Sequence, residues 1–183
     1  TLVYTLSLHD ALPISETLGL EELSSFLNDF YSNVTKVVME YNGRINKFIG
    51  DEVMTIFNMD GNLEDHRLWA VKAGLELVRA LNETNHIRAK KGEIKIGVGI
   101  GINTGMVLLG SFGSGLRQDY TAIGDNVNIA ARLQAQALAG EVIVSDAVYQ
   151  AVKDKVDAED MGEKPLKGKG QPLRLWKINS LRA

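Results

Sequence analysis

The sequence predicts an α+β domain, because two stretches with helical periodicity alternate with short runs that have strand character. Apolar residues recur at intervals of three and four over residues 20–41 and again over residues 63–81. Residues 44–57 and 94–102 are rich in Ile, Val and Phe and are bounded by Gly and Asn. Elements of these two kinds pack as a sheet covered by helices.

The composition is that of one ordinary globular domain. The chain has 183 residues, of which 45% are hydrophobic and 23% charged, and its net charge is −3. A chain of this size buries roughly 70% of its unfolded surface. The acidic balance argues against nucleic acid or an anionic membrane as a partner, and no apolar run reaches the ~20 residues of a spanning helix. The absence of cysteine excludes disulfides and thiolate metal sites and favours the cytoplasm.

The opening residues are predicted to be foreign to the domain. Residues 5–14 match one reading frame of a widely used sequencing-library adapter, and their pattern does not continue into the helix that follows. Segments of such origin are excluded from fold reasoning. We therefore predict a non-native leader at residues 1–14, with a genuine strand over residues 2–8 as the alternative.

A hairpin is predicted after the first helix. Strand-like runs at Arg44–Ile49 and Glu52–Phe57 are separated by Gly50 and Asp51, a loop that favours a tight turn. Asp51 is thereby placed at the tip, where a carboxylate can reach Mg²⁺, a cation that takes one or two carboxylates together with substrate phosphates. An Asp in a turn is more commonly a simple turn residue. Lys47 lies on the same hairpin and is a second candidate for a functional role. The alternative is that it is an ordinary strand lysine that faces solvent.

The remaining strands are predicted from Gly and β-branched residues. Residues 94–102 alternate Ile, Val and Gly so closely that a strand covered on both faces is expected. Its alternate glycines leave one face bare for another backbone or a ligand. Residues 106–110 are predicted to be its partner strand and 112–117 a longer loop. Later elements are expected at 141–144 (strand), 145–152 (helix), near 156 (strand) and 173–178 (strand).

A polar stripe on an apolar helix is the strongest sign of chemistry in the chain. Gly124 interrupts an extended segment, and Asp125 is predicted to be the N-cap of the helix that follows. Asn128 and Arg132, four residues apart, lie within roughly 40° of each other around its axis. A charged side chain among small apolar neighbours is either paired or directed at a ligand. A surface Arg beside a helix-start Asn is the alternative.

A basic, glycine-containing loop lies near the C-terminus. Lys167 and Lys169 alternate with Gly168 and Gly170. Two ammonium groups on flexible backbone can close on phosphates as point charges. An exposed basic turn is the alternative.

Four motifs occur together in an order that resembles the class III adenylate/guanylate cyclase catalytic domain. They are Asn46–Met54, Gly99–Gly105, Asp119–Leu133 and Leu166–Gly170. The resemblance covers residues 15–179 and leaves 180–183 as a tail. It implies a ferredoxin-like βαββαβ core sheet with helices on one face, extra C-terminal strands, and a first core strand that is replaced or missing.

The resemblance also implies a role for each candidate residue. Asp51 would hold Mg²⁺ or Mn²⁺, of which the family binds two ions, and Lys47 and Thr121 would read adenine. Asn128 would orient the ribose, and Arg132 would stabilise charge on the transferring phosphoryl group. Lys167 would hold the terminal phosphates. A Lys with a Thr is typical of bacterial adenylate cyclases, whereas guanylate cyclases use Glu in place of this Lys. The first metal-binding Asp of the family corresponds to Ser7, which predicts impaired activity.

The implied reaction is attack of the ATP ribose 3′-oxygen on the α-phosphorus, giving cyclic AMP and pyrophosphate for second-messenger signalling. The family works as a head-to-tail dimer, so a homodimer is expected, with an upstream sensor or membrane domain in the full-length protein. The alternatives are a degenerate domain that binds nucleotide or a partner without turnover, a guanylate cyclase, and a non-enzymatic α+β interaction module. The Ser at position 7 favours the degenerate domain, while Asp51, Asn128 and Arg132 favour an active parent enzyme.

Overall fold

The chain folds into a sheet of seven strands, a separate hairpin of two strands, and four helices, in a computed structural model that describes residues 2–9, 19–166 and 170–182. The strands are β1 (Leu2–His9), β2 (Gly43–Ile49), β3 (Glu52–Phe57), β4 (Gly97–Thr104), β5 (Leu108–Ser114), β6 (Arg117–Ile123), β7 (Val142–Ser145), β8 (Val156–Lys164) and β9 (Leu173–Leu181). The helices are α2 (Leu20–Glu40), α3 (His66–Lys90), α4 (Asp125–Gln134) and α5 (Asp146–Val152). No helix within these described ranges is long and apolar enough to cross a membrane.

The topology confirms the predicted ferredoxin-like core. The order of the large sheet is β2-β3-β1-β4-β7-β9-β8, and its first four strands are all antiparallel. They are built from the chain order β1, α2, β2, β3, α3, β4. Strand β7 then joins β4 in parallel, and β9 and β8 follow antiparallel. These last three strands are the predicted C-terminal additions.

Strand β1 occupies the centre of the sheet. It pairs with β3 on one side and with β4 along its whole length on the other. Tyr4, Leu6 and Leu8 are buried beneath α2 and α3, whereas Val3 is buried on the opposite face. The first core strand was expected to be replaced or missing. It is not missing, because residues 2–9 fill its place, and its replacement by foreign residues stays a prediction. The foreign origin of residues 1–14 stays a prediction, and residues 10–14 lie outside the described ranges.

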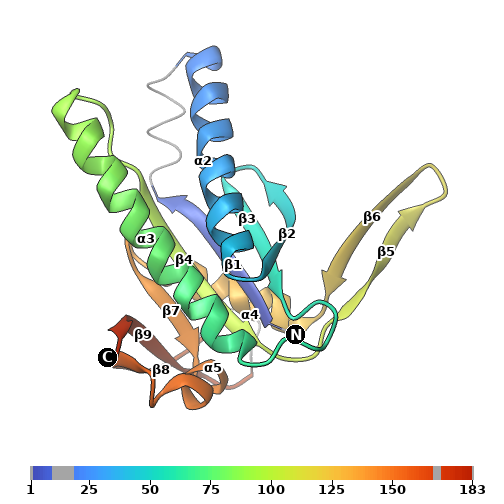
Figure 1. Ribbon diagram of the computed structural model, residues 1–183. Coiled ribbons are helices and arrows are strands. Elements are labelled where there is room, and N and C mark those ends of the chain that lie inside the picture. The colour runs from blue at the N-terminus through green and yellow to red at the C-terminus, as the bar shows by residue number, and fades with distance from the viewer. Residues whose placement is uncertain (1, 10–18, 167–169, 183) are drawn as a thin grey trace.

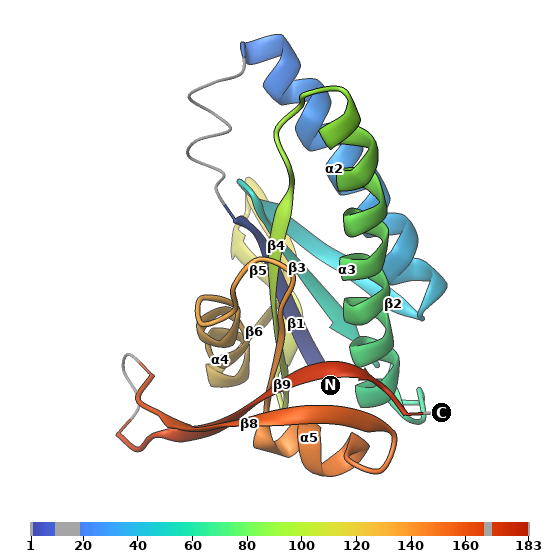
Figure 2. The same ribbon diagram turned by 90° about the vertical axis from the view of Figure 1, so that its left-hand side faces the viewer.

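The helices form layers on both faces of the sheet, not on one. Helices α2 and α3 cover one face and α4 lies on the other (Figures 1 and 2). The two helices of the βαββαβ core, α2 and α3, lie on one face as expected, and Gly101 on β4 explains how α4 packs on the other. A Cβ at Gly101 would lie 2.2 Å from the Gln134 nitrogen and 2.3 Å from the Ala130 oxygen, so only glycine lets α4 pack this closely.

The two long helices follow the predicted periodicity with shifted ends. Helix α2 stops just before Asn42, whose φ of 62° is the left-handed conformation of a helix C-terminus. Helix α3 starts at His66, after Asp65 with a φ of 50°, and continues to Lys90, beyond the predicted end at residue 81. The last turns of α3 are mostly exposed and polar. A prediction from the spacing of apolar residues therefore ends this helix too early.

The hairpin β5–β6 is an arm that stands out from the body of the domain (Figure 1). Residues 106–110 were predicted to pair with the strand now seen as β4, and 112–117 to form a loop. Both expectations are wrong, because β4 has β1 on one edge and β7 on the other and has no free edge for a further strand. Strand β5 pairs instead with β6, from Leu108 opposite Ile123 to Ser114 opposite Arg117.

Candidate active site

Asp51 lies at the tip of the β2–β3 hairpin, beside the central strand. Gly50 precedes it with a φ of +60°, so the predicted tight turn has the backbone that glycine allows. The Ser7 hydroxyl on β1 donates a hydrogen bond to Asp51 Oδ2 over 2.7 Å. Glu52, directly after Asp51, is half-buried, and this burial together with the Asp51 charge raises the pKa of its carboxyl group. Position 7 is therefore adjacent to the carboxylate expected to bind metal.

The residues around Asp51 do not match a binding site for two cations. Nowhere in the described part of the chain do three or more His, Cys, Asp or Glu side chains gather closely enough to hold a metal ion. Ser7 contributes a neutral hydroxyl whose proton is already directed at Asp51. Hard divalent cations prefer charged and neutral oxygen ligands that present free lone pairs. Among the described residues, Asp51 therefore has the neutral Ser7 hydroxyl as its hydrogen-bond partner and Glu52 as the carboxyl group next to it in the chain.

Tyr31 on α2 supports this hairpin tip from the side. Its hydroxyl donates a hydrogen bond to the Gly50 carbonyl oxygen, and its ring lies 4.4 Å from the Phe48 ring, centroid to centroid. Partial burial and the Asp51 charge raise the pKa of the Tyr31 hydroxyl. The turn that carries Asp51 is thus fixed by a helix as well as by its own strands.

The two residues predicted to read a purine lie on adjacent strands. Lys47 is on β2 and Thr121 is on β6, and these strands contact each other at the base of the arm. Thr121 is 8% exposed, and its hydroxyl donates to Asn46 Oδ1 over 2.8 Å. The Asn46 amide nitrogen donates to the Tyr120 carbonyl over 3.3 Å. Asn46 therefore links the strands that carry Lys47 and Thr121.

Helix α4 carries the predicted polar stripe. Asn128 is exposed and Arg132 is half-buried on this helix. Nη1 of Arg132 is buried and has no hydrogen-bond partner, which is unfavourable for a charged group unless a ligand supplies an acceptor. Gly124, with a φ of 151°, is the N-cap, and Asp125 is the first helical residue instead of the predicted cap.

The predicted residues form separate groups within one chain. Lys47 and Thr121 are connected through Asn46. Across the described ranges, no hydrogen bond or ion pair joins Asp51 to Asn128 or Arg132. Lys167 lies outside the described residues.

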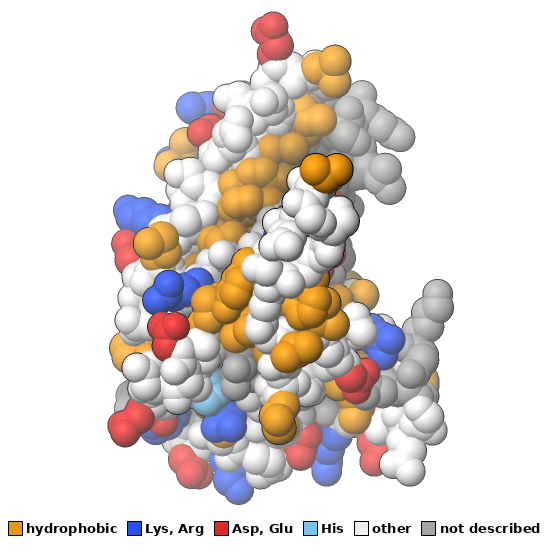
Figure 3. Space-filling model, turned by 90° about the vertical axis from the view of Figure 1, so that its right-hand side faces the viewer, with side chains coloured by type: hydrophobic (Ala, Val, Ile, Leu, Met, Phe, Trp, Pro, Cys, Tyr) orange, Lys and Arg blue, Asp and Glu red, His pale blue; other side chains and the backbone are white. Residues whose placement is uncertain are grey.

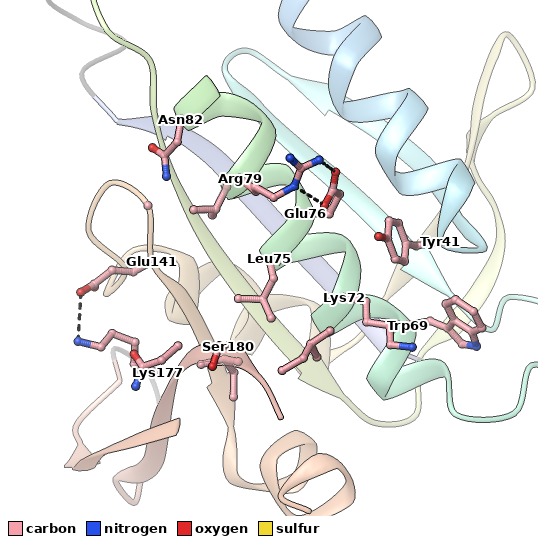
Figure 4. A pocket seen from close by; sticks show the side chains of 15 residues that line it. Tyr41, Trp69, Lys72, Leu75, Glu76, Arg79, Asn82, Glu141, Lys177 and Ser180 are labelled. Carbon is pink, nitrogen blue, oxygen red and sulfur yellow. Dashed lines mark hydrogen bonds and ion pairs between the residues drawn. The ribbon is translucent and has the colours of Figure 1, made fainter. Parts of the chain in front are cut away.

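One hollow of the domain lies away from Lys47, Asp51, Thr121, Asn128 and Arg132. It has a volume of about 840 Å³ and lies between α3 and the C-terminal strands, with Trp69, Lys72 and Leu75 on one side and Lys177 on the other (Figure 4). Lys177 forms an ion pair with Glu141 at 3.7 Å across its rim. None of the predicted site residues that the structure describes lines it, so it belongs to a different surface.

The face that carries the arm exposes large apolar side chains. Hydrophobic groups gather on this side of the domain (Figure 3). The exposed residues on β2 and on or beside the arm are Phe48, Ile49, Met106, Leu108, Leu116, Tyr120 and Ile123. Apolar surface concentrated in this way is typical of an interface with another protein.

The sheet order and the two helical layers define an α+β domain with a ferredoxin-like core. The chain belongs to the adenylate and guanylate cyclase catalytic domain family, whose profile matches residues 9–179. It is 30% identical over 173 residues to adenylate cyclase 1 of Rhizobium meliloti, which covers 93% of this chain and 26% of that protein. The chain therefore spans about a quarter of that relative's length.

Solved structures support the same assignment. The adenylyl cyclase CyaB from P. aeruginosa superposes with a TM-score of 0.93 at 30% identity, covering 99% of this chain and 94% of that chain. The guanylyl cyclase Cya2 superposes with a TM-score of 0.88 at 29% identity, covering 99% of this chain and 92% of that chain. Enzymes named for either purine therefore share this fold.

Two residues at the site were missed by the sequence analysis. Asn46 and Tyr31 act through contacts with β6 and with the hairpin tip. Asn46 precedes Lys47 in the Asn46–Met54 motif. The periodicity of the strand does not indicate that the Asn46 side chain reaches another strand. Tyr31 is part of the apolar stripe of α2. Its hydroxyl, which usually finds a hydrogen-bond partner in a folded protein, is the one sequence feature that could have indicated a polar contact.

Proposed function

We propose that the chain is the catalytic domain of an adenylate cyclase that converts ATP to cyclic AMP and pyrophosphate. Family membership and the similarity to bacterial adenylate cyclases support this proposal. The full-length protein would carry an upstream sensor or membrane domain and act in second-messenger signalling, with this domain in the cytoplasm.

The observation that carries the proposal is the Arg132 guanidinium. One of its nitrogens is buried without a partner on a helix whose neighbouring turn presents the exposed Asn128. A fixed cationic donor contributes most when negative charge develops beside it, as on a phosphoryl group during transfer. Arg132 would stabilise that charge, and Asn128 would orient the ribose.

The choice of ATP over GTP is supported by the pair on β2 and β6. Asn46, the neighbour of Lys47 on β2, is hydrogen-bonded to Thr121 on β6, which supports a shared purine subsite for Lys47 and Thr121. Guanylate cyclases of the family have Glu where this chain has Lys47. Lys47 and Thr121 would bind the edge of the adenine ring. The ribose and phosphates of the bound nucleotide would then lie next to α4.

In the proposed reaction the ribose 3′-oxygen forms a bond to the α-phosphorus, and the bond from that phosphorus to the bridging oxygen of pyrophosphate breaks. The 3′-hydroxyl releases its proton to water, and the leaving pyrophosphate takes up the electron pair of the broken bond and its negative charge. Arg132 would act at the transferring group and Lys167 at the terminal phosphates. Holding the 3′-oxygen close to phosphorus and in line with the leaving group supplies much of the rate enhancement of such a reaction.

Domains of this family generally use divalent metal ions. We propose Asp51 as the residue that would hold Mg²⁺ or Mn²⁺, although position 7 lacks the second carboxylate of the family. Ser7 stands where it would be expected, hydrogen-bonded to Asp51 over 2.7 Å. The chain as it stands would therefore bind nucleotide with little or no turnover, whereas a parent enzyme with Asp at this position would be active.

The working unit would be a head-to-tail homodimer with sites at the interface. The exposed apolar side chains on β2 and the arm support this assembly (Figure 3). A second copy would bring its own Asp51 to the Arg132 of the first.

The test is to incubate the chain and its Ser7→Asp variant with ATP or GTP in Mg²⁺ or Mn²⁺ and to measure cyclic nucleotide and pyrophosphate. We expect equal amounts of cyclic AMP and pyrophosphate from Ser7→Asp and much less from the unchanged chain. Ser24→Asp, on an exposed position of α2, is the control for added negative charge. Nucleotide binding without turnover in both proteins would support the degenerate domain. A preference for GTP would support a guanylate cyclase. If neither protein bound nucleotide, the non-enzymatic interaction module would be the remaining alternative.

A further inference from the structure

Asn46 lies at an irregularity of β2. On one side of it Ile45 is paired with Thr55, and on the other Lys47 is paired with Met54, so two steps along β2 match one step along β3. Asn46 is the extra residue of a β-bulge. Bulges bend a strand and redirect the side chain of the extra residue, and they are frequent beside active sites. Here the side chain is directed to β6.

The hydrogen bonds of Asn46 fix which way its amide faces. The Tyr120 carbonyl oxygen only accepts, so the Asn46 nitrogen must be the group that donates to it, over 3.3 Å. The Asn46 oxygen is thereby turned to Thr121 at 2.8 Å. An amide oxygen carries no hydrogen, and the Thr121 hydroxyl must therefore donate in this contact.

This arrangement determines what Thr121 can offer to a ligand. A hydroxyl has one hydrogen and two lone pairs, and the hydrogen of Thr121 is used on Asn46. What remains is an acceptor. The exocyclic group of adenine is an amine, which donates, whereas the corresponding group of guanine is a carbonyl, which accepts. An acceptor at Thr121 thus matches adenine and leaves two acceptors facing each other with guanine.

We propose that Asn46 is a positioning residue that holds the Thr121 hydroxyl as an acceptor and thereby selects adenine nucleotides over guanine nucleotides. This inference rests on the proposed function of Lys47 and Thr121 in purine reading and adds the residue that sets the polarity of that subsite. Without Asn46 the Thr121 hydroxyl is free to rotate and donate to a guanine carbonyl. A site that presents fixed polar groups discriminates against a mismatched partner because those groups are then left unpaired.

The experiment measures the ratio of ATP to GTP affinity within each variant, using displacement of a fluorescent N-methylanthraniloyl-ATP from the full chain in Mg²⁺. Asn46→Ala should reduce the preference for ATP by about tenfold, the scale of one buried hydrogen bond. Asn46→Asp should retain the preference, because a carboxylate still accepts from Thr121 although it loses the donor to Tyr120. Asn62→Ala, on an exposed loop, is the matched control and should leave the ratio unchanged.

A double variant tests whether Asn46 acts through Thr121. Thr121→Val should reduce the discrimination at least as much as Asn46→Ala does, and Asn46→Ala should then have no further effect. Each ratio is internal to one protein, so a lower folded fraction does not imitate the result. If the unchanged chain prefers ATP and Asn46→Ala keeps that preference, or if Asn46→Asp loses it like Asn46→Ala, the inference is overturned while the proposed function stands. If the unchanged chain binds neither nucleotide or prefers GTP, both are overturned.

Discussion

Ser7 on the central strand β1 donates a hydrogen bond to Asp51 at the hairpin tip, with 2.7 Å between the two oxygens. The contact joins the first strand of the chain to the turn between β2 and β3, two segments far apart in the sequence. A carboxylate at position 7 would stand close enough to Asp51 to share a cation, which is the arrangement that Mg²⁺ sites with two carboxylates use. The proposed loss of activity therefore depends on a single side chain.

The first prediction concerns Arg132, whose buried nitrogen has no partner. In the Ser7→Asp background, Arg132→Ala should lower the turnover of ATP by roughly 10²–10³, because it removes a fixed charge from the transferring phosphoryl group. Cyclic AMP production under saturating ATP measures the effect. Arg44→Ala is the control, since Arg44 forms an exposed ion pair with Asp60 at 3.1 Å. An unchanged rate in Arg132→Ala would exclude this role.

The second prediction concerns Lys47 on β2. Lys47→Glu should weaken the preference for ATP over GTP by about tenfold or more, because it replaces a donor at the purine edge with an acceptor. Competition between the two nucleotides for one site gives the ratio directly. Lys36→Glu, on the exposed side of α2, makes the same charge change elsewhere. A ratio that does not respond to Lys47→Glu would remove Lys47 from purine reading.

Local signals were enough to predict the first helix and the hairpin that carries Asp51. The apolar spacing of α2 and the Gly50–Asp51 pair each act within a few residues, and both elements occur where they were expected. The stripe of Asn128 and Arg132 follows from helix geometry alone, and both residues do lie on α4. Such features need no knowledge of the rest of the fold.

Features that depend on pairing between distant strands were not predictable in the same way. The central place of β1 requires two partners, β3 and β4, that follow much later in the chain. The role of Asn46 depends on a bulge, which shifts the register by one residue and leaves the periodicity of side-chain types unchanged. The position of α4 on the second face depends on its close contact with Gly101.

The third prediction tests whether β1 is an integral strand or a foreign leader that the domain tolerates. Leu6 is fully buried in the core beneath α2 and α3. Leu6→Ala should lower the free energy of unfolding by about 2–5 kcal/mol, the usual cost of such a cavity. Urea unfolding measures it, with Leu138→Ala as the control because Leu138 is 65% exposed. A change as small as that of the control would show that β1 is not packed in the core.

The fourth prediction concerns the support of the hairpin tip by Tyr31. Tyr31→Phe keeps the ring contact with Phe48 and removes the hydrogen bond to the Gly50 carbonyl. The expected loss of stability is about 0.5–1.5 kcal/mol, that of one hydrogen bond, with faster amide exchange at the turn. Tyr149→Phe is a matched control, because it keeps the stacking of that ring on Trp176 at 3.6 Å. Unchanged exchange at Gly50 and Asp51 would contradict the supporting role.

The last prediction concerns the pH dependence of stability and involves His66 in the first turn of α3. Burial, and then the charge of Arg67, lower the pKa of His66 below its ordinary value of 6.5. Its Nδ1 lies 3.3 Å from the Leu63 carbonyl, and its Nε2 is buried without a partner, so a proton on Nε2 would have no acceptor. A positive charge at a helix N-terminus is also unfavourable.

The sign follows from this lowered pKa of His66. Below pH 6.5 the unfolded chain takes up a proton at His66 that the folded chain resists. The free energy of unfolding should therefore be retained above about pH 6.5, the ordinary pKa of His, and fall as the pH decreases below that value. His66→Gln should make this slope shallower in urea unfolding at each pH, whereas His86→Gln, on the exposed part of the same helix, should leave it unchanged. Equal slopes for His66→Gln and the unchanged chain would show that His66 does not contribute to the pH dependence.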